Sequence, residues 1–133
     1  MKDNPFSGNW SYRSFLRDPD LSVEFNDLRF GAGNLVFLEA PFGVAEGTLG
    51  GEGWSLALSG RCAFGSPNEI VFQGKGLIGG DEWVYDYHGF LAPQWPNGID
   101  ERLSIVGSIV RTVPHSSGQS KAGLVASWIA VKQ

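Results

Sequence analysis

Residues 83–91 read WVYDYHGFL, and aromatic and polar side chains alternate along them. One parity carries Trp83, Tyr85, Tyr87, Gly89 and Leu91, and the other carries Val84, Asp86, His88 and Phe90. Successive side chains of a β-strand point to opposite faces, so this stretch predicts a strand with two unlike faces. The alternation alone leaves open which of the two faces points toward a core.

The same two-residue period recurs on both sides of this stretch, between turn signals rich in Gly, Pro, Asn and Ser. DPDLSVEFNDL, residues 18–28, has Asp18 and Pro19 at its start and apolar residues at helical spacing, so we expect a short helical turn near 19–28. A longer loop is expected at 92–101. The eight expected strands are residues 7–16, 34–40, 43–50, 53–62, 68–78, 82–91, 102–113 and 121–132.

Short connections make neighbours in sequence neighbours in space, as in an antiparallel meander. A flat sheet of eight long strands would expose two unpaired edges, and closing the sheet removes them. We therefore predict an all-β fold, an eight-stranded antiparallel up-and-down β-barrel, with the helical turn between the first two strands. A sandwich of two β-sheets is the structural alternative.

Composition favours one soluble domain over residues 1–133. Hydrophobic residues make up 42% of the chain, the net charge is −4, and no Lys/Arg cluster indicates a nucleic-acid or membrane surface. The single cysteine, Cys62, excludes an internal disulfide. The polar start MKDNPFSGNW shows no signal peptide, and no apolar run is long enough to span a bilayer. We expect a cytoplasmic protein.

Three short stretches resemble the calycin barrels, which include the avidins, streptavidin and the lipocalins. FSGNW at 6–10 is similar to the Gly-x-Trp that opens their first strand. EGTLGG at 46–51 and LSGRCAFGSP at 58–67 are similar to the Gly-Thr-Tyr and Leu-Thr-Gly-Arg strands of the avidin family. The resemblance implies a calycin-type barrel, with Trp10 plugging or lining one end. It also implies a homo-oligomer, a dimer or a tetramer.

The same resemblance implies that the biotin site of the avidins is not retained. Tyr12 and Leu16 occupy the positions where avidins carry the Asn and Ser that contact the ureido group of biotin. The avidin strand with Trp-Leu-Leu corresponds to SIVGSIVRTV at 104–113, which has no Trp. We therefore expect the fold of the family and a different ligand.

Two predictions for the barrel interior follow from the two faces of 83–91. If Trp83, Tyr85 and Tyr87 point inward, they form an aromatic cup that suits a flat or hydrophobic ligand with a polar handle. If Asp86 and His88 point inward instead, a carboxylate and an imidazole share the lumen, and such a pair can act as acid and base near neutral pH. In the third interpretation, Asp86 and His88 are ordinary polar strand residues.

Two arginines and two loop residues complete the candidate site. Arg13 and Arg111 lie among apolar strand neighbours, and a lumenal arginine would suit a ligand carboxylate held by two hydrogen bonds. The alternatives for them are solvent or an ion pair with Glu39 or Asp86. His115 follows an expected strand, at a barrel mouth. Trp95, in the 92–101 loop, is expected to act as a lid, insert into a neighbouring subunit or cover a barrel end.

The leading functional prediction is a barrel that binds a small, largely apolar or aromatic molecule, with Arg13 or Arg111 as a polar anchor. One alternative is a cofactor-free isomerase, cyclase or lyase with Asp86 and His88 as acid and base. Another is a filled barrel that binds no ligand and associates through an outward face of Leu124, Ala126, Trp128 and Ala130. We expect no cofactor and no metal site, because neither His88 nor His115 lies in a metal-binding motif. The expected lining is Trp10, Tyr12, Trp83, Tyr85 and Tyr87.

Overall fold

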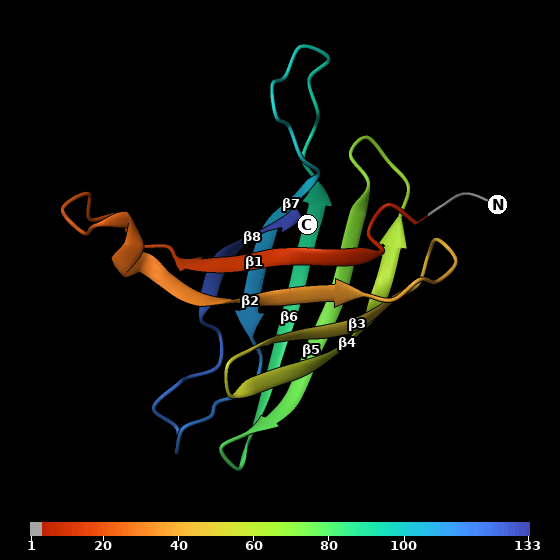
Figure 1. The fold of residues 1–133 in the computed structure, drawn as a ribbon. Helices are drawn as coiled ribbons and strands as arrows, with labels where there is room; N and C mark the ends of the chain where they lie inside the picture. Colours follow the sequence, from red (N-terminus) through yellow and green to blue (C-terminus); the bar gives the residue numbers. More distant parts are fainter. Residues whose placement is uncertain (1–3) are drawn as a thin grey trace.

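In the computed structural model, which describes residues 4–133, eight antiparallel strands follow one another around a closed barrel (Figure 1). Each strand pairs with the next, and β1 also pairs with β8, which closes the sheet. This confirms the predicted eight-stranded up-and-down barrel and excludes the sandwich. The elements are β1 (Gly8–Leu16), η1 (Phe25–Leu28), β2 (Arg29–Phe37), β3 (Ala45–Gly51), β4 (Trp54–Ala63), β5 (Glu69–Ile78), β6 (Asp81–Leu91), β7 (Ser104–Arg111) and β8 (Val125–Lys132).

Strand β2 departs most from its predicted bounds of 34–40. It begins at Arg29 and ends at Phe37. Its first half, RFGAG, has no clear alternation, but it pairs with β1, where Gly31 lies opposite Ser14. Backbone pairing therefore extends the strand through residues whose side chains give no strand signal. Strands β7 and β8 are shorter than predicted, and the helical turn is limited to the single 3-10 turn η1.

Burial alternates along the strands and identifies the face that lines the lumen. In β6, Tyr85 and Tyr87 are buried, whereas Asp86 and His88 are exposed. The aromatic face of residues 83–91 is therefore the inner one. In β8 the inner face carries Ala126, Trp128 and Ala130, which are all buried. The prediction that these three side chains form an outward subunit interface is therefore wrong, because they fill the barrel.

Two inward glycines mark places where neighbouring strands approach closely. A Cβ atom on Gly107 of β7 would overlap the backbone carbonyl of His88 in β6. A Cβ atom on Gly47 of β3 would overlap the carbonyl of Val36 in β2. The absence of a side chain at these positions lets the sheet curve tightly enough to close.

The two ends of the barrel differ. At one end, called the plugged end, Phe6 and Trp10 are fully buried, and Trp10 Nε1 donates a hydrogen bond to the Phe6 carbonyl at 2.9 Å. Lys132 Nζ lies 4.8 Å from the centroid of the Trp10 ring and donates to the Ser7 carbonyl. The other end, called the open end, is formed by the β1–β2, β3–β4, β5–β6 and β7–β8 connections (Figure 1).

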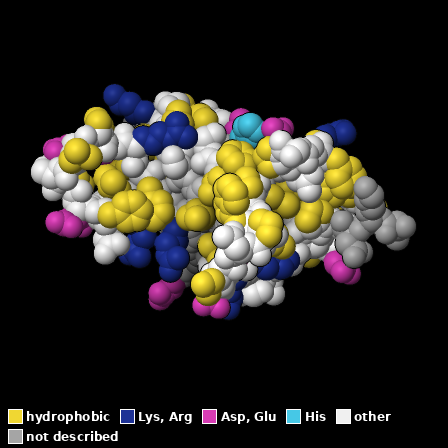
Figure 2. All heavy atoms as spheres, turned by 90° about the horizontal axis from the view of Figure 1, so that it is seen from above, with side chains coloured by type: hydrophobic (Ala, Val, Ile, Leu, Met, Phe, Trp, Pro, Cys, Tyr) yellow, Lys and Arg dark blue, Asp and Glu magenta, His cyan; other side chains and the backbone are white. Residues whose placement is uncertain are grey.

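The outer surface carries hydrophobic as well as charged side chains. Seen from above, hydrophobic side chains gather near the centre of the molecule, and charged ones are spread around them (Figure 2). Leu38, Trp95 and Ile99 are among the exposed large hydrophobic residues. Within residues 4–133, no helical segment has the length and apolar character needed to cross a bilayer.

Candidate functional site

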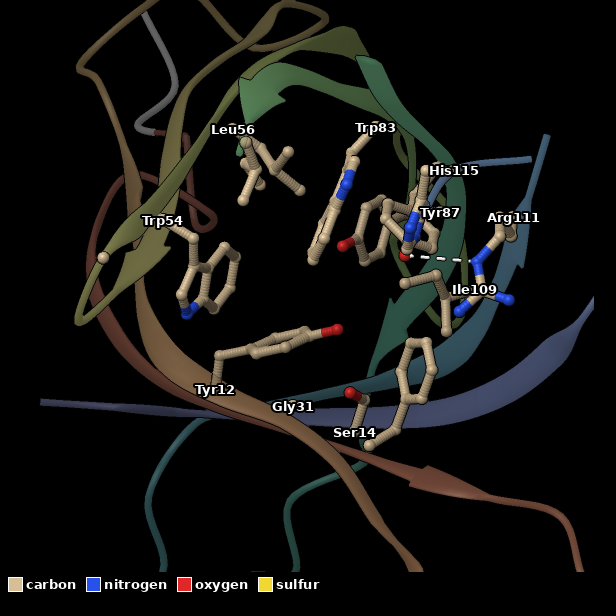
Figure 3. A pocket seen from close by; sticks show the side chains of 14 residues that line it. Tyr12, Ser14, Gly31, Trp54, Leu56, Trp83, Tyr87, Ile109, Arg111 and His115 are labelled. Carbon is tan, nitrogen blue, oxygen red and sulfur yellow. Dashed lines mark hydrogen bonds between the residues drawn. The ribbon is translucent and has the colours of Figure 1, made fainter. Parts of the chain in front are cut away.

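A pocket of about 370 Å³ occupies the lumen toward the open end of the barrel (Figure 3). Strands β1, β2, β4, β5, β6 and β7 all contribute to its wall, and His115 reaches it from the β7–β8 connection. This volume lies near the lower limit of typical small-molecule sites. Most of the wall is apolar, and six of its residues carry phenyl, phenol or indole rings: Tyr12, Phe30, Trp54, Trp83, Tyr85 and Tyr87.

The floor of the pocket is a packed aromatic cluster. Tyr87 stacks on Phe72, with ring centroids 4.6 Å apart and an interplanar angle of 9°. Trp128 lies 5.9 Å from Tyr12 and 5.8 Å from Tyr87, and its Nε1 donates to the Ser108 carbonyl at 3.0 Å. These side chains fill the barrel between the pocket and the plugged end. The pocket therefore opens toward the open end of the barrel.

Two phenol groups lie within this apolar surrounding and point into the pocket (Figure 3). Burial raises the pKa of Tyr12 to about 12, although the nearby hydroxyls of Ser14 and Tyr87 oppose the rise. Burial is also the main cause that raises the pKa of Tyr87 well above its ordinary value, and Tyr12 adds to the rise. Both phenols are therefore neutral at physiological pH and can donate or accept a hydrogen bond.

A connected polar group lies on one side of the pocket, formed by Arg111, Tyr85 and His115. Arg111 Nε donates to the Tyr85 hydroxyl at 3.3 Å (Figure 3). The same hydroxyl lies 3.0 Å from His115 Nε2. Because the Tyr85 oxygen accepts a hydrogen bond from Arg111 Nε–H, the hydroxyl proton of Tyr85 is free to be donated to His115 Nε2. That arrangement leaves the imidazole proton on Nδ1, which lies 2.9 Å from the Ser116 hydroxyl.

The β7–β8 connection holds His115 against the strands. The imidazole stacks on the Trp83 ring, with centroids 4.1 Å apart and an interplanar angle of 14°. The Ser116 backbone N–H donates to Asp81 Oδ2 at 3.1 Å, which ties the loop to the start of β6. Burial lowers the pKa of His115, the positive charge of Arg111 lowers it further, and Asp81 opposes both effects. His115 is therefore neutral at pH 7.

Arg111 is a buried cation without a buried counter-ion. Its side chain is 8% exposed, and its guanidinium carbon lies 5.5 Å from the Phe30 ring centroid and 5.8 Å from that of Tyr85. Arg111 Nη1 donates to the Lys121 carbonyl at 3.2 Å. No carboxylate among residues 4–133 forms an ion pair with it, so the predicted alternative of a bridge to Glu39 or Asp86 is not observed.

The structure brings six of the predicted ligand-binding residues together in the pocket wall, and it places three elsewhere. Trp10 is inside the barrel but at the plugged end. Arg13 is exposed on the outer face of β1. Trp95 is 71% exposed in the β6–β7 connection, at the plugged end, so it does not cover the pocket. The six that meet are Tyr12, Trp83, Tyr85, Tyr87, Arg111 and His115.

Asp86 and His88, the predicted acid–base pair, lie outside the lumen. Both are exposed on the outer face of β6, because their parity is opposite to that of the buried tyrosines. Asp86 Oδ1 accepts a hydrogen bond from Gln73 Nε2 at 3.0 Å. The two residues border an outer hollow of about 500 Å³ beside Arg61. The inward arrangement of the pair, one of the two alternatives from the sequence, is therefore not the one observed.

Several wall residues were not among the sequence-based candidates. Trp54 and Leu56 share one parity of the predicted strand 53–62, so the alternation of that strand could have identified them together. Phe30 lies outside the predicted strand 34–40 and gave no such signal. Ile78 ends its strand at a turn, where parity is a weak guide. Within residues 4–133, no group of three or more His, Cys, Asp or Glu side chains is placed to hold a metal ion.

Comparison of the chain with known protein families, with curated proteins and with solved structures finds no match.

Proposed function

We propose that the barrel holds a small, largely apolar or aromatic molecule in the pocket at its open end. The observation that carries this proposal is the 370 Å³ cavity itself, whose wall is mostly apolar and contains six aromatic rings. A well-formed apolar cavity with a few polar groups is the usual form of a small-molecule site. An unliganded cavity of this kind leaves apolar surface in contact with water, and a ligand that covers this surface gains free energy.

The arrangement of the rings supports a flat ligand. In Figure 3 the indoles of Trp54 and Trp83 stand on two sides of the cavity, and the Tyr12 ring lies beneath them. Trp83 is itself supported from behind by the His115 imidazole, at 4.1 Å. Aromatic walls of this kind stack favourably against a planar, unsaturated molecule. The phenols of Tyr12 and Tyr87 supply polar contacts deeper in the pocket.

The resemblance to the calycins agrees with this proposal. The Gly-x-Trp of Gly8 and Trp10, which resembles the opening of avidins and lipocalins, places the indole at the plugged end. Avidins and lipocalins bind small ligands inside such barrels, between a closed end and an open one. We extend that role to this chain, while its ligand differs from biotin because Tyr12 stands in place of the avidin Asn.

A fluorescent probe tests the proposal directly. N-phenyl-1-naphthylamine is neutral and aromatic, and its emission rises when it leaves water for an apolar site. We expect saturable binding to the native protein and weaker binding after Trp83→Ala, which removes one wall. Trp95→Ala, which removes an exposed indole at the plugged end, is the matched control and should bind as the wild type does.

A second variant fills the cavity instead of enlarging it. Leu56→Trp adds a large ring to the pocket wall and should exclude the probe from a protein whose circular dichroism is still that of a β-barrel. If the wild type gives no saturable signal, or if Leu56→Trp binds the probe as well as the wild type, the pocket is not the binding site.

A further inference from the structure

The cation in the pocket wall indicates which kind of ligand the barrel takes. We propose that the bound molecule is an aromatic or unsaturated monocarboxylate whose carboxylate pairs with Arg111, an inference that rests on the binding function proposed above. Three features of the pocket support this inference: the missing counter-ion of Arg111, the fixed orientation of its guanidinium, and the absence of a second cation in the described pocket wall.

The first feature is that no described carboxylate pairs with Arg111. Arg111 is 8% exposed, and a buried charge is costly unless it is paired. The cation–π contacts with Phe30 and Tyr85 offset part of this cost. The ion pair found among residues 4–133, Lys75 with Glu82, lies on the outer surface and does not involve the pocket. A ligand carboxylate would supply the negative charge that the surrounding residues do not.

The second feature is that hydrogen bonds hold the Arg111 guanidinium in one orientation. Arg111 Nε donates to Tyr85, and Nη1 donates to the Lys121 carbonyl, so two separate elements hold the group in place. Arginine has five N–H donors, and two of them are used in these bonds. Nη2 makes no hydrogen bond with any residue in the described part of the chain, 4–133. The free donors of a fixed guanidinium match the two oxygens of a carboxylate.

The third feature is that the described pocket wall carries a single cation. Arg111 is the one Lys or Arg side chain in the described pocket wall, and His115 beside it is neutral at pH 7. A phosphate dianion would bring more negative charge than this site can balance. The rest of the wall is largely aromatic, which favours a ring or a conjugated chain attached to the acid. A monocarboxylate satisfies both conditions.

Displacement of the fluorescent probe distinguishes acid from neutral ligands. The competitors are 2-naphthoate and 2-naphthamide, which share one ring system and differ in the charge of the substituent. We expect 2-naphthoate to displace N-phenyl-1-naphthylamine from the wild type about tenfold or more better than 2-naphthamide does. Added salt should reduce that ratio, since part of the preference is electrostatic.

Variants at two arginines locate the preference. Arg111→Gln should still bind the neutral probe, but its ratio of naphthoate to naphthamide affinity should fall to about one. Arg111→Lys keeps the positive charge but loses the planar pair of N–H donors. Its affinity ratio should therefore lie between those of the wild type and Arg111→Gln. Arg13→Gln removes an exposed arginine from the outer face of β1 and should leave the ratio unchanged.

The outcomes separate this inference from the function on which it rests. If the probe does not bind to the wild type, the proposed binding function fails. If the probe binds but naphthoate and naphthamide compete equally in the wild type, the carboxylate proposal fails while the binding function stands. That comparison needs no variant, so it holds even if Arg111→Gln does not fold. If the wild-type ratio of naphthoate to naphthamide affinity persists in Arg111→Lys and in a folded Arg111→Gln, the carboxylate does not pair with Arg111.

Discussion

At the scale of single residues, Arg111 and His115 are the basic side chains in the described part of the pocket wall. Arg111 is a nearly buried cation in an aromatic wall, and His115 is a neutral imidazole linked to it through the Tyr85 hydroxyl. A buried charge without a partner of opposite charge destabilises the folded state. Each of the two residues makes a measurable prediction about stability.

Replacing Arg111 with methionine should leave the unliganded protein as stable as the wild type or more stable by about 1 kcal/mol. The thioether chain fits the same apolar space between Phe30 and the Tyr85 ring without a desolvated charge. Urea unfolding followed by tryptophan fluorescence would give the free energies. If the free energy of unfolding fell by more than about 1 kcal/mol, Arg111 would be shown to stabilise the fold, because substitutions at surface positions usually change this free energy by less.

His115 should make stability depend on pH in the acid range. Its pKa is lowered in the folded protein, mainly by burial and then by Arg111, with Asp81 opposing and the Tyr85 hydroxyl in contact. The unfolded chain therefore binds a proton first as the pH falls through about 6.5. The free energy of unfolding should be constant with respect to this group above that pH and should decrease below it, until the folded imidazole also protonates.

Denaturant unfolding between pH 5 and pH 8, roughly the range in which histidine titrates, would reveal this contribution. His115→Gln should flatten the acid side of the curve relative to the wild type. His88→Gln, at an exposed position on the outer face, is the control. A wild-type curve that matches that of His115→Gln throughout would contradict the assignment.

At the scale of elements, the strands of this chain differ in how clearly their side-chain pattern predicts them. β6 could be predicted within a residue because its alternation is strict and its aromatic residues are large. β2 could not, because its first half is RFGAG and its strand conformation comes from pairing with β1. Helical spacing at 18–28 was a weaker guide still, since Leu21 and Phe25 are exposed and no residue of η1 is buried, so little apolar burial stabilises a longer helix.

The glycine positions on the inner face make an element-scale prediction. Gly107→Ala should destabilise the protein by about 2 kcal/mol or more, because the new methyl group would overlap the backbone of β6 at His88 and Gly89. Thermal unfolding by circular dichroism measures this. Ser59→Ala, on the exposed face of β4, should change stability by less than about 0.5 kcal/mol. Equal melting temperatures for the two variants would argue against a close approach of β6 and β7.

At the scale of the whole molecule, one aromatic cluster joins strands that are distant in sequence. Trp128 of β8 contacts Tyr12 of β1, Phe72 of β5 and Tyr87 of β6, with ring centroids 5.8 to 5.9 Å apart. These contacts cross the lumen, so they hold opposite sides of the sheet together beneath the pocket. The free energy of barrel closure should therefore depend strongly on this single side chain.

Trp128→Ala should lower the free energy of unfolding by about 3 to 5 kcal/mol, because it leaves a cavity in the centre of the barrel. Trp95→Ala is the matched control, since that indole is 71% exposed, and should change it by about 0.5 kcal/mol or less. Denaturation with guanidinium would compare them. If both variants lost a similar free energy of unfolding, the Trp128 indole would not be a main stabilising contact of the barrel core.

Taken over the whole chain, the sequence predicts the architecture better than the site. The prediction of the barrel draws on eight strands, so an error in one strand does not change the fold. The site depends on which of the two faces of each strand points inward. It also depends on where the loops lie. The aromatic face of 83–91 and the residue types at 111 and 115 pointed to the pocket wall, whereas nothing local could place Trp95 and Trp10 at the opposite end.

Both ends of the described chain lie at the plugged end, where β1 begins and β8 finishes, and the Gln133 backbone N–H donates to the Asn9 carbonyl at 3.0 Å. A protein fused at either end, or a solid support to which the chain is tethered there, would therefore sit behind the barrel and leave the pocket facing solution. The geometry suits oriented immobilisation on a surface, in which every molecule presents the open end of its barrel outward.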